Sequence, residues 1–326
     1  MEARDYGTEA AKTMDFPLGD LLDPKRCYDF LVSLLHPQGL DCPGGHPLED
    51  AFIHKRDRAP ILDYRCKTCG RCFNLFTGTV LQGTKYNEVQ VVQLLHGIAD
   101  GKPTAQLARE MGVDRKWLLI RRHQLQALAS QGRSPEPLPD PVVEVDEMYQ
   151  NAGEKGERHP HAEDPPRRRG NKVRGHGAWE RDRPAVFGIV GRQTEQVRLG
   201  VVHHSTREEL EARVLEGTVP GACVNSDEWE AYHHLPEADR GHVTVCHAPG
   251  KREWARDDDG DGVGEVHNNT MEGIWTGLRN FLRRFRGMHK KYLDQYVAIF
   301  AWAHNLKTAT VGFLRALLGV LTPNAP

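Results

Sequence analysis

A cluster of cysteines constrains the fold of this chain more than any other feature of its sequence. Four of the seven cysteines and one histidine follow one another at short spacings, in the order Cys42, His46, Cys66, Cys69 and Cys72. Zinc takes four tetrahedral thiolate or imidazole ligands, and two short-spaced pairs on two turns supply them. We therefore predict a zinc ribbon over residues 40–84 with one structural Zn²⁺, and either His46 or Cys72 as its fourth ligand.

A helical pattern follows the cysteine cluster. Apolar residues recur at helical spacing from Asn87 to Ala129, with breaks at residues 101–103 and at Gly112. A short helix, a glycine turn and a second helix with several cations are typical of a helix-turn-helix, whose second helix enters the major groove of DNA. We predict this domain over residues 85–129. Its expected DNA-contacting residues are Arg115, Lys116, Arg121 and Arg122. The alternative is a helical bundle with a solvated basic face.

The pattern changes after residues 130–141, a proline-rich stretch that we interpret as a linker. Five β-rich runs are then expected, over Val142–Tyr149, Ala185–Gly191, Val197–His203, Ala222–Ser226 and His242–Cys246. Three helices are expected over Arg207–Glu216, Thr270–Arg286 and Lys290–Thr310. This mixture predicts one α/β domain over residues 142–310. The rest of the chain is assigned to an N-terminal helical segment (1–39) and a C-terminal tail (311–326).

Three acids of the α/β domain occupy positions where a carboxylate needs a partner or a ligand. Asp146 lies in an apolar predicted strand, where burial is costly unless the carboxylate is paired or binds a metal. Asp227 follows the end of another predicted strand, where ligand-binding side chains collect in α/β sheets. Glu272 lies on the helix that begins near Thr270. Two-metal phosphoryl transfer requires separated acids of this kind, so we predict that these three bind two Mg²⁺ or Mn²⁺ ions.

The helix that carries Glu272 is amphipathic. Its apolar side chains form one stripe, whereas Glu272, Arg279, Arg283 and Arg286 fall on the opposite side. Arg279 is seven residues, and so two turns, beyond Glu272 on the same face. A carboxylate followed by a row of arginines suits a metal-held phosphate with a DNA backbone running past it. We expect Arg279 to take part in catalysis and all three arginines to contact DNA.

The net charge of −2 conceals two basic stretches. Residues 167–183 contain seven Lys/Arg against two acids, and residues 273–293 contain six Lys/Arg and no acid. Local basic patches attract a phosphate backbone, whatever the charge of the whole chain. Five further DNA-binding residues are therefore predicted: Arg167, Arg168, Arg169, Lys290 and Lys291. For the arginine run, the alternative is a solvated insertion.

Several short segments resemble those of insertion-sequence transposases. They are Tyr64–Cys69, Phe76–Thr79, Val145–Tyr149, Asn225–Tyr232, His267–Trp275, Lys290–Tyr296 and Ala303–Asn305. Over roughly residues 40–310 the chain resembles the bacterial insertion-sequence family numbered fifteen ninety-five, which carries a zinc ribbon before an RNase H-like DDE domain. The resemblance implies a mixed five-stranded sheet with flanking helices, and Asp146, Asp227 and Glu272 as the catalytic triad. Arg279 stands where the family usually has lysine, and Gly45 where its first zinc knuckle often has cysteine.

The activity that this resemblance implies is DNA transposition. We expect binding to the terminal inverted repeats of an insertion sequence, cleavage at the element ends and joining of the 3′-hydroxyl to target DNA. Homo-oligomers assembled on double-stranded DNA are expected as well. Two alternatives stay open: a non-catalytic DNA-binding regulator on an RNase H-like scaffold, and a nuclease that cuts DNA without joining it.

Residues 257–262 resemble the start of a calcium loop. Asp257, Asp259 and Asp261 precede Gly262 at the required spacing, but the twelfth position is Asn268 rather than glutamate. A polar loop near the active site is the alternative interpretation.

Targeting signals are not apparent in the sequence. No opening stretch combines a basic region, an apolar core and a cleavage site, and the late apolar segment 311–321 is short and interrupted by Arg315. We therefore expect a cytoplasmic, nucleoid-associated protein.

Overall fold

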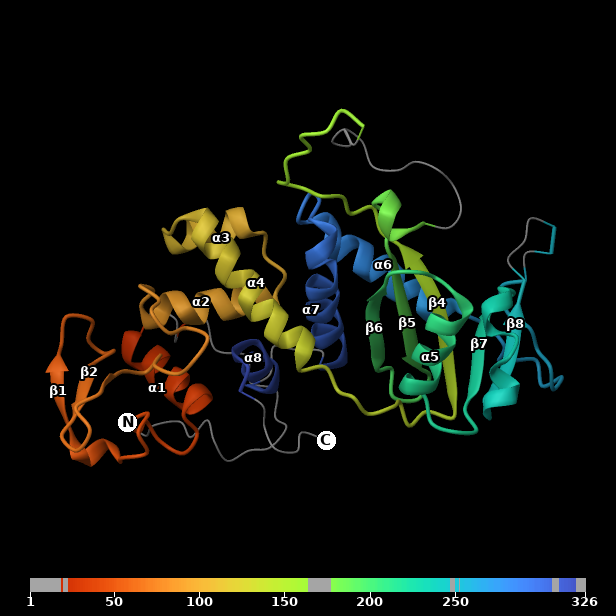
Figure 1. Cartoon of the computed structure of the whole chain (residues 1–326). Coiled ribbons are helices and arrows are strands. Elements are labelled where there is room, and N and C mark those ends of the chain that lie inside the picture. The colour runs from red at the N-terminus through yellow and green to blue at the C-terminus, as the bar shows by residue number, and fades with distance from the viewer. Residues whose placement is uncertain are drawn as a thin grey trace. The chain divides into compact units, whose positions relative to one another are not determined.

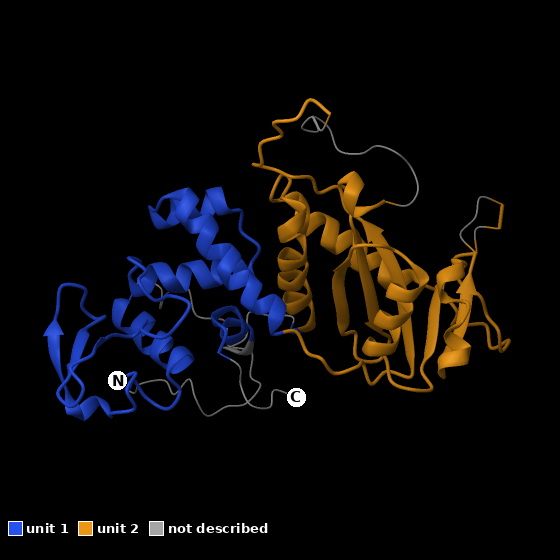
Figure 2. Cartoon of the chain, in the orientation of Figure 1, with its two compact units in different colours: residues 1–132, 306–326 blue, residues 133–305 orange. Residues whose placement is uncertain are grey.

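The computed structural model describes residues 19, 23–163, 177–246, 250–251, 253–306 and 311–320. The chain divides into two compact units, residues 1–132 with 306–326 and residues 133–305 (Figure 2). Short 3-10 helices occur at Leu48–Asp50, Trp179–Arg181, Glu230–Tyr232, Leu235–Ala238 and Lys290–Tyr292. Of the helices in these described ranges, none has both the length and the apolar character needed to cross a bilayer.

The described part of the first unit contains a small ribbon and several α-helices (Figure 1). The ribbon is a three-stranded antiparallel sheet of β1 (Ala51–Lys55), β2 (Asp63–Cys66) and β3 (Cys72–Phe73). The helices are α1 (Pro24–Leu35), α2 (Glu88–Ala99), α3 (Thr104–Met111), α4 (Arg115–Gln131) and α8 (Val311–Leu318). The C-terminal segment, predicted as a tail, thus contributes α8. This helix packs against α4, α1 and α2, and buries Phe313 and Leu317 completely.

Helices α3 and α4 follow one another across a short turn, and their assignment to a DNA-binding helix-turn-helix stays a prediction. Gly112 ends α3 with a φ of 64°, a left-handed conformation that favours glycine. The side chain of Asp114 accepts the amide of Trp117 and caps the start of α4. The breaks predicted at residues 101–103 and at Gly112 are confirmed, since α2 ends at Ala99 and α3 begins at Thr104, and the second break has a local chemical cause.

The second unit is built on a five-stranded mixed sheet in the order β6-β5-β4-β7-β8. Its strands are β4 (Val142–Tyr149), β5 (Ala185–Gly191), β6 (Val197–Val202), β7 (Cys223–Asp227) and β8 (Gly241–Val245). β5 is antiparallel to β4 and to β6, whereas β4, β7 and β8 run parallel. This order and these directions are those of the RNase H-like fold. The predicted fold class is confirmed.

Helices cover both faces of this sheet (Figure 1). α5 (Arg207–Gly217) packs on one face against a cluster that includes Val143 and Val145. α6 (Asn269–Arg283) and α7 (Leu293–Leu306) cover the other face and pack on Met148 and its neighbours. Because successive strand residues point to opposite faces, Glu144 and Asp146 share the face of Met148, under α6.

Candidate active site and zinc centre

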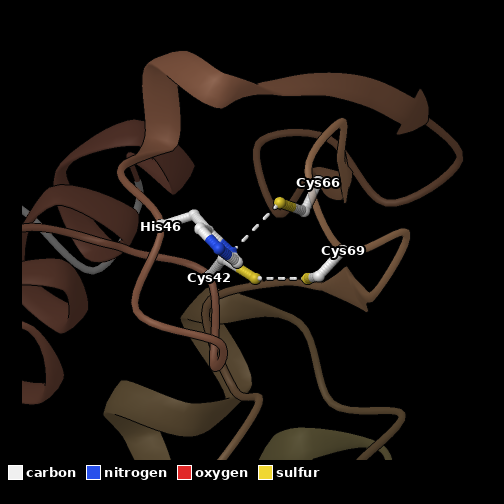
Figure 3. Close-up of side chains that lie close together, drawn as sticks. All are labelled: Cys42, His46, Cys66 and Cys69. Carbon is white, nitrogen blue, oxygen red and sulfur yellow. Dashed lines mark hydrogen bonds between the residues drawn. The ribbon is translucent and has the colours of Figure 1, made fainter.

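The predicted zinc ligands of the ribbon come together in the structure. The ligand atoms of Cys42, His46, Cys66 and Cys69 all lie within 4.8 Å of one another (Figure 3). The sulfurs of Cys42 and Cys69 are 3.4 Å apart, and the sulfur of Cys66 is 3.6 Å from Nδ1 of His46. Cys72 is exposed on β3 and lies outside this group. Of the two alternatives for a fourth ligand, the structure therefore favours His46.

Two turns of different length bring these ligands together. The amide of Cys66 donates to the carbonyl of Arg71, five residues on, whereas the amide of Cys42 donates to that of His46, four residues on. The shorter turn contains Gly45 at a φ of 79°, a left-handed conformation that favours glycine. The histidine directly after this turn reaches the group with its longer side chain, in place of the missing second cysteine.

Backbone hydrogen bonds prepare one thiol for metal binding. Amides of Cys69 and Thr68 donate to the sulfur of Cys66 and lower its pKa to about 6, although burial acts in the opposite direction. Burial raises the pKa of the Cys42 thiol. Because the thiolate is the form that binds metals, the lowered pKa prepares the Cys66 sulfur for an ion. Three sulfurs and one imidazole match a tetrahedral structural zinc site.

Strand pairing places the first two acids of the predicted triad side by side. β4 and β7 pair in parallel, with Glu144 opposite Asn225. Asp146 and Asp227 each lie two residues beyond this pair, so they lie on the same face at the same level of the sheet. α6, which covers this face, carries Glu272 in its first turn. The middle of β4, the end of β7 and the start of α6 therefore contribute to one site.

The charges of Asp227 and Glu272 both act on Asp146, which indicates that the three carboxylates lie near one another. The pKa of Asp146 is raised to about 6, first by burial and then by the charges of Asp227 and Glu272, against two hydrogen bonds that lower it. Like charges in a partly buried site repel one another, and a divalent cation relieves this repulsion. The triad is wider than the ribbon site, however. It is not among the groups of described residues whose ligand atoms all lie within 4.8 Å.

Trp275 on α6 orients the carboxylate of Asp146. Its Nε1 donates to Oδ2 at 2.8 Å, and the amide of Glu147 donates to Oδ1 at 2.8 Å. Each oxygen keeps a lone pair for a metal ion. The indole fits because Gly188 lies opposite Asp146 on β5, where a Cβ would be 2.7 Å from Cη2 of Trp275. The sequence analysis did not select Trp275, although it lies three residues beyond Glu272 and borders the apolar stripe.

A family comparison identifies the domain that carries these acids. The model of the ISXO2-like transposase domain, which describes the DDE transposases of insertion-sequence family fifteen ninety-five, matches residues 137–305. The chain belongs to this transposase family. An uncharacterized protein in transposable element ISH50 of Halobacterium salinarum is 27% identical over 286 residues, which cover 87% of this chain and 92% of the relative. That organism is an archaeon, so the resemblance extends beyond the bacterial members.

Two solved structures are distantly similar to this transposase. The simian T-cell lymphotropic virus intasome in complex with PP2A regulatory subunit B56 gamma is 13% identical, with a TM-score of 0.31 over 65% of this chain and 67% of that one. The HTLV-2 integrase catalytic core domain in complex with magnesium is 12% identical, with a TM-score of 0.28 over 52% of this chain and 86% of that one. Both scores are low, and the fold assignment rests on the strand order and directions instead.

Glu147 is a further carboxylate of the transposase near the triad. It follows Asp146 on β4, and its pKa is raised well above the ordinary value by burial and then by the charges of Asp146 and Asp227. Its Oε1 is buried and has no hydrogen-bond partner among the described residues. This environment favours the neutral form, which adds no charge to the triad. Glu147 was not among the site residues predicted from the sequence.

The predicted DNA-binding cations differ in how accessible they are. Arg115 and Lys116 are exposed in the first turn of α4. Arg279 and Arg283 are exposed on α6, and Arg286 is exposed just after it. These five stay predictions with accessible side chains. The run Arg167, Arg168 and Arg169 lies outside the described residues.

Other cations that were predicted to bind DNA make hydrogen bonds or ion pairs within the protein. Arg121 donates to the carbonyl of Val80 at 2.9 Å, and Arg122 is fully buried and donates to the carbonyl of Lys102 at 2.5 Å. Lys290 is only 8% exposed, and its ammonium pairs with the carboxylates of Glu154 and Asp182. Lys291 is exposed and pairs with Glu157. Arg122 and Lys290 therefore have structural partners in place of DNA phosphates.

The acidic loop that resembles a calcium loop has its own internal bonds. The carboxylates of Asp257 and Asp259 lie within 4.8 Å of that of Glu265. The side chain of Asn268 donates to the carbonyl of Val145. Backbone amides of the loop donate to Asp257 and lower its pKa. The carboxylates are thus engaged by the loop's own backbone.

Proposed function

We propose that this transposase binds the terminal repeats of an insertion sequence, cleaves the DNA at the element ends and joins the freed 3′-hydroxyl to target DNA. The observation that carries the proposal is the convergence of Asp146, Asp227 and Glu272 on one face of the sheet, where two of these acids raise the pKa of the third. Membership of a transposase family supplies the reaction class.

The donor sets fit two kinds of metal. The three carboxylates would hold Mg²⁺ or Mn²⁺, with Asp146 between both ions because each of its oxygens keeps a free lone pair. When bound, such ions activate the attacking oxygen and stabilise the leaving oxygen of phosphoryl transfer. In the ribbon, one structural Zn²⁺ would be held by Cys42, His46, Cys66 and Cys69.

Exposed cations near these sites would hold the DNA. Arg279 lies two helical turns from Glu272 on the exposed face of α6, where its guanidinium can contact a backbone phosphate beside the reacting one. Arg283 and Arg286 extend the same row. On α4, Arg115 and Lys116 occupy the start of the helix that a helix-turn-helix presents to the major groove. We expect copies of the chain to assemble on paired element ends.

Cleavage of labelled duplexes that carry the ends of the encoding element tests the proposal. We expect wild type to nick these ends in Mg²⁺ or Mn²⁺, and Asp146→Asn to lose at least on the order of 10³ in rate while still binding the duplex. Glu237→Gln, on an exposed acid of a distant 3-10 helix, is the matched control and should cleave like wild type. Binding without cleavage by wild type would support a regulator, and equal cleavage by Asp146→Asn would refute the triad.

A further inference from the structure

The N-terminus of helix α6 is capped by a carboxylate from another element, Glu144 on β4. Its N-cap residue, Asn268, makes no side-chain hydrogen bond to the first amides of the helix. Glu144 on β4 takes this role, because its Oε2 accepts the amide of Met271 at 2.9 Å and its Oε1 accepts the hydroxyl of Thr270 at 2.8 Å. A carboxylate at a helix N-terminus also interacts favourably with the helix dipole. The start of α6 is therefore anchored to β4, two residues before Asp146.

Arg192 holds the segment that leads into α6. Its Nε donates to Oε1 of Glu144 at 2.9 Å, one Nη donates to the carbonyl of His267 at 2.7 Å, and the other donates to the carbonyl of Glu265. The carboxylate of Glu144 is fully buried in this pair, and the side chain of Arg192 is 19% exposed. One guanidinium thus connects the strand residue with the backbone just before the helix.

Two amide side chains reinforce the same connection. Nδ2 of Asn268 donates to the carbonyl of Val145 at 3.1 Å, and Nδ2 of Asn225 donates to the carbonyl of His267 at 3.1 Å. These bonds tie residues 265–271 to β4 and β7, the strands that carry the first two acids. Glu272 is the next residue along the chain.

We propose that Glu144, together with Arg192, is a positioning residue that sets α6 on the sheet and thereby places Glu272 relative to Asp146 and Asp227. The inference rests on the proposed function, in which Glu272 is a metal ligand. A buried ion pair adds little net stability compared with apolar side chains of similar size, because desolvation offsets the attraction. Several donors that converge on one carboxylate nevertheless define its geometry closely.

Glu144 is not itself a fourth metal ligand. Its side chain is fully buried, and both carboxylate oxygens accept hydrogen bonds from protein donors. Residues that orient metal ligands without touching the metal typically change metal affinity or activity by about 10- to 100-fold when they are substituted. We expect an effect of this size from Glu144.

Mn²⁺ binding to the full-length protein tests the inference without requiring DNA or turnover. Free Mn²⁺ is measured by electron paramagnetic resonance, and the binding that Glu272→Gln removes defines the triad site. We expect Glu144→Gln to weaken this binding by about tenfold or more. Thr270→Val, which loses one donor to Glu144, should weaken it less, and Thr270→Ser, which keeps the hydroxyl, should bind like wild type.

Hydrogen exchange of the metal-free protein gives a second readout. In Glu144→Gln, amides of the first turn of α6 should exchange faster, whereas those of α7 and of the zinc ribbon should not change. Should Glu144→Gln fail to fold, the Thr270→Val and Thr270→Ser pair decides by the same two measurements. Wild-type Mn²⁺ affinity together with unchanged exchange in α6 would overturn the inference.

The two proposals can fail separately. Mn²⁺ binding that depends on both Glu272 and Glu144, in a protein that joins no DNA, would leave the positioning role standing and refute the proposed function. If wild type shows no Mn²⁺ binding that Glu272→Gln removes, then Glu144 positions no ligand and the inference is overturned.

Discussion

The ribbon and the acid site gather metal-ligating side chains in different ways. In the ribbon, four ligand atoms lie within 4.8 Å of one another, next to the turns that hold them. The three acids lie farther apart, and their carboxylates raise the pKa of Asp146. Only the Cys66 thiol has a pKa shifted toward the ionised form, so the ribbon ligands carry less negative charge than three carboxylates and can share a small volume, whereas carboxylates repel one another. Local turns therefore suffice for the first site, and the second needs partners from distant elements.

The largest expected effect belongs to the ribbon. Cys66→Ser should abolish stoichiometric zinc and unfold the ribbon, because a structural zinc contributes on the order of 10 kcal/mol of folding free energy. Cys72→Ser is the matched control, since Cys72 lies outside the ligand group, and it should keep both zinc and fold. Metal analysis and circular dichroism measure the outcome. Loss of zinc in Cys72→Ser with retention in His46→Ala would reverse the ligand assignment.

Replacing a ligand of the acid site should stabilise the metal-free protein, whereas replacing a ligand of the ribbon should unfold the ribbon. Asp146 has a folded pKa of about 6 against an ordinary value of 3.8, so its contribution to stability is fully present below about pH 4 and is lost as the pH rises through about 6. Asp146→Asn should therefore stabilise the protein without added Mg²⁺ at pH 7.5 by about 1–3 kcal/mol. The gain should disappear near pH ~4. Denaturant unfolding measures it, and destabilisation at pH 7.5 would contradict the electrostatic account.

The hydrogen bond from Trp275 offers a finer test of the same site. Trp275→Phe keeps most of the packing and removes the donor to Asp146, so the cleavage rate should fall about tenfold, the value of roughly one hydrogen bond to a charged group. Phe300→Leu, in the same core cluster, changes packing without touching this bond and serves as the control. Equal rate losses in both variants would mean that packing, not the hydrogen bond, matters.

The smallest effect concerns two cations that were predicted to contact DNA. Arg279 is exposed, whereas Lys290 is buried between Glu154 and Asp182. Arg279→Gln should reduce the slope of log affinity for DNA against log salt by about one, because one phosphate contact is lost. Lys290→Gln should leave this slope unchanged and lower the melting temperature. The reverse pattern would place Lys290, not Arg279, on the DNA.

Secondary structure was predictable where its cause is local. The alternation in Val142–Tyr149 and the glycine after α3 lie within the segments that they shape, so β4 and the helix breaks were predicted correctly. The segment 311–326 was assigned to a tail because the helices that bury it are far away in the sequence. Helix α8 packs against α4, α1 and α2, which are nearly 200 residues or more away in the sequence.

The residues of the two metal sites were likewise predictable where a local motif marks them. Spacing and motif predicted the four residues that gather in the ribbon, and the three acids whose pKa coupling the structure shows. Trp275 and Arg192 were not predicted, because their partners Asp146 and Glu144 are 129 and 48 residues away. Lys290 was predicted to contact DNA because it lies in a basic stretch of the sequence. The carboxylates that it pairs with, Glu154 and Asp182, come from distant segments and could not be anticipated.

Strand transfer tests the central claim most directly. Precut element ends, a supercoiled target and Mg²⁺ or Mn²⁺ are incubated with wild type or with Glu272→Gln, and joined product is measured on a gel. The account predicts joined product from wild type and none from Glu272→Gln, with equal binding of the ends by both proteins. Binding without joining by wild type, or joining by Glu272→Gln at the wild-type rate, would contradict it.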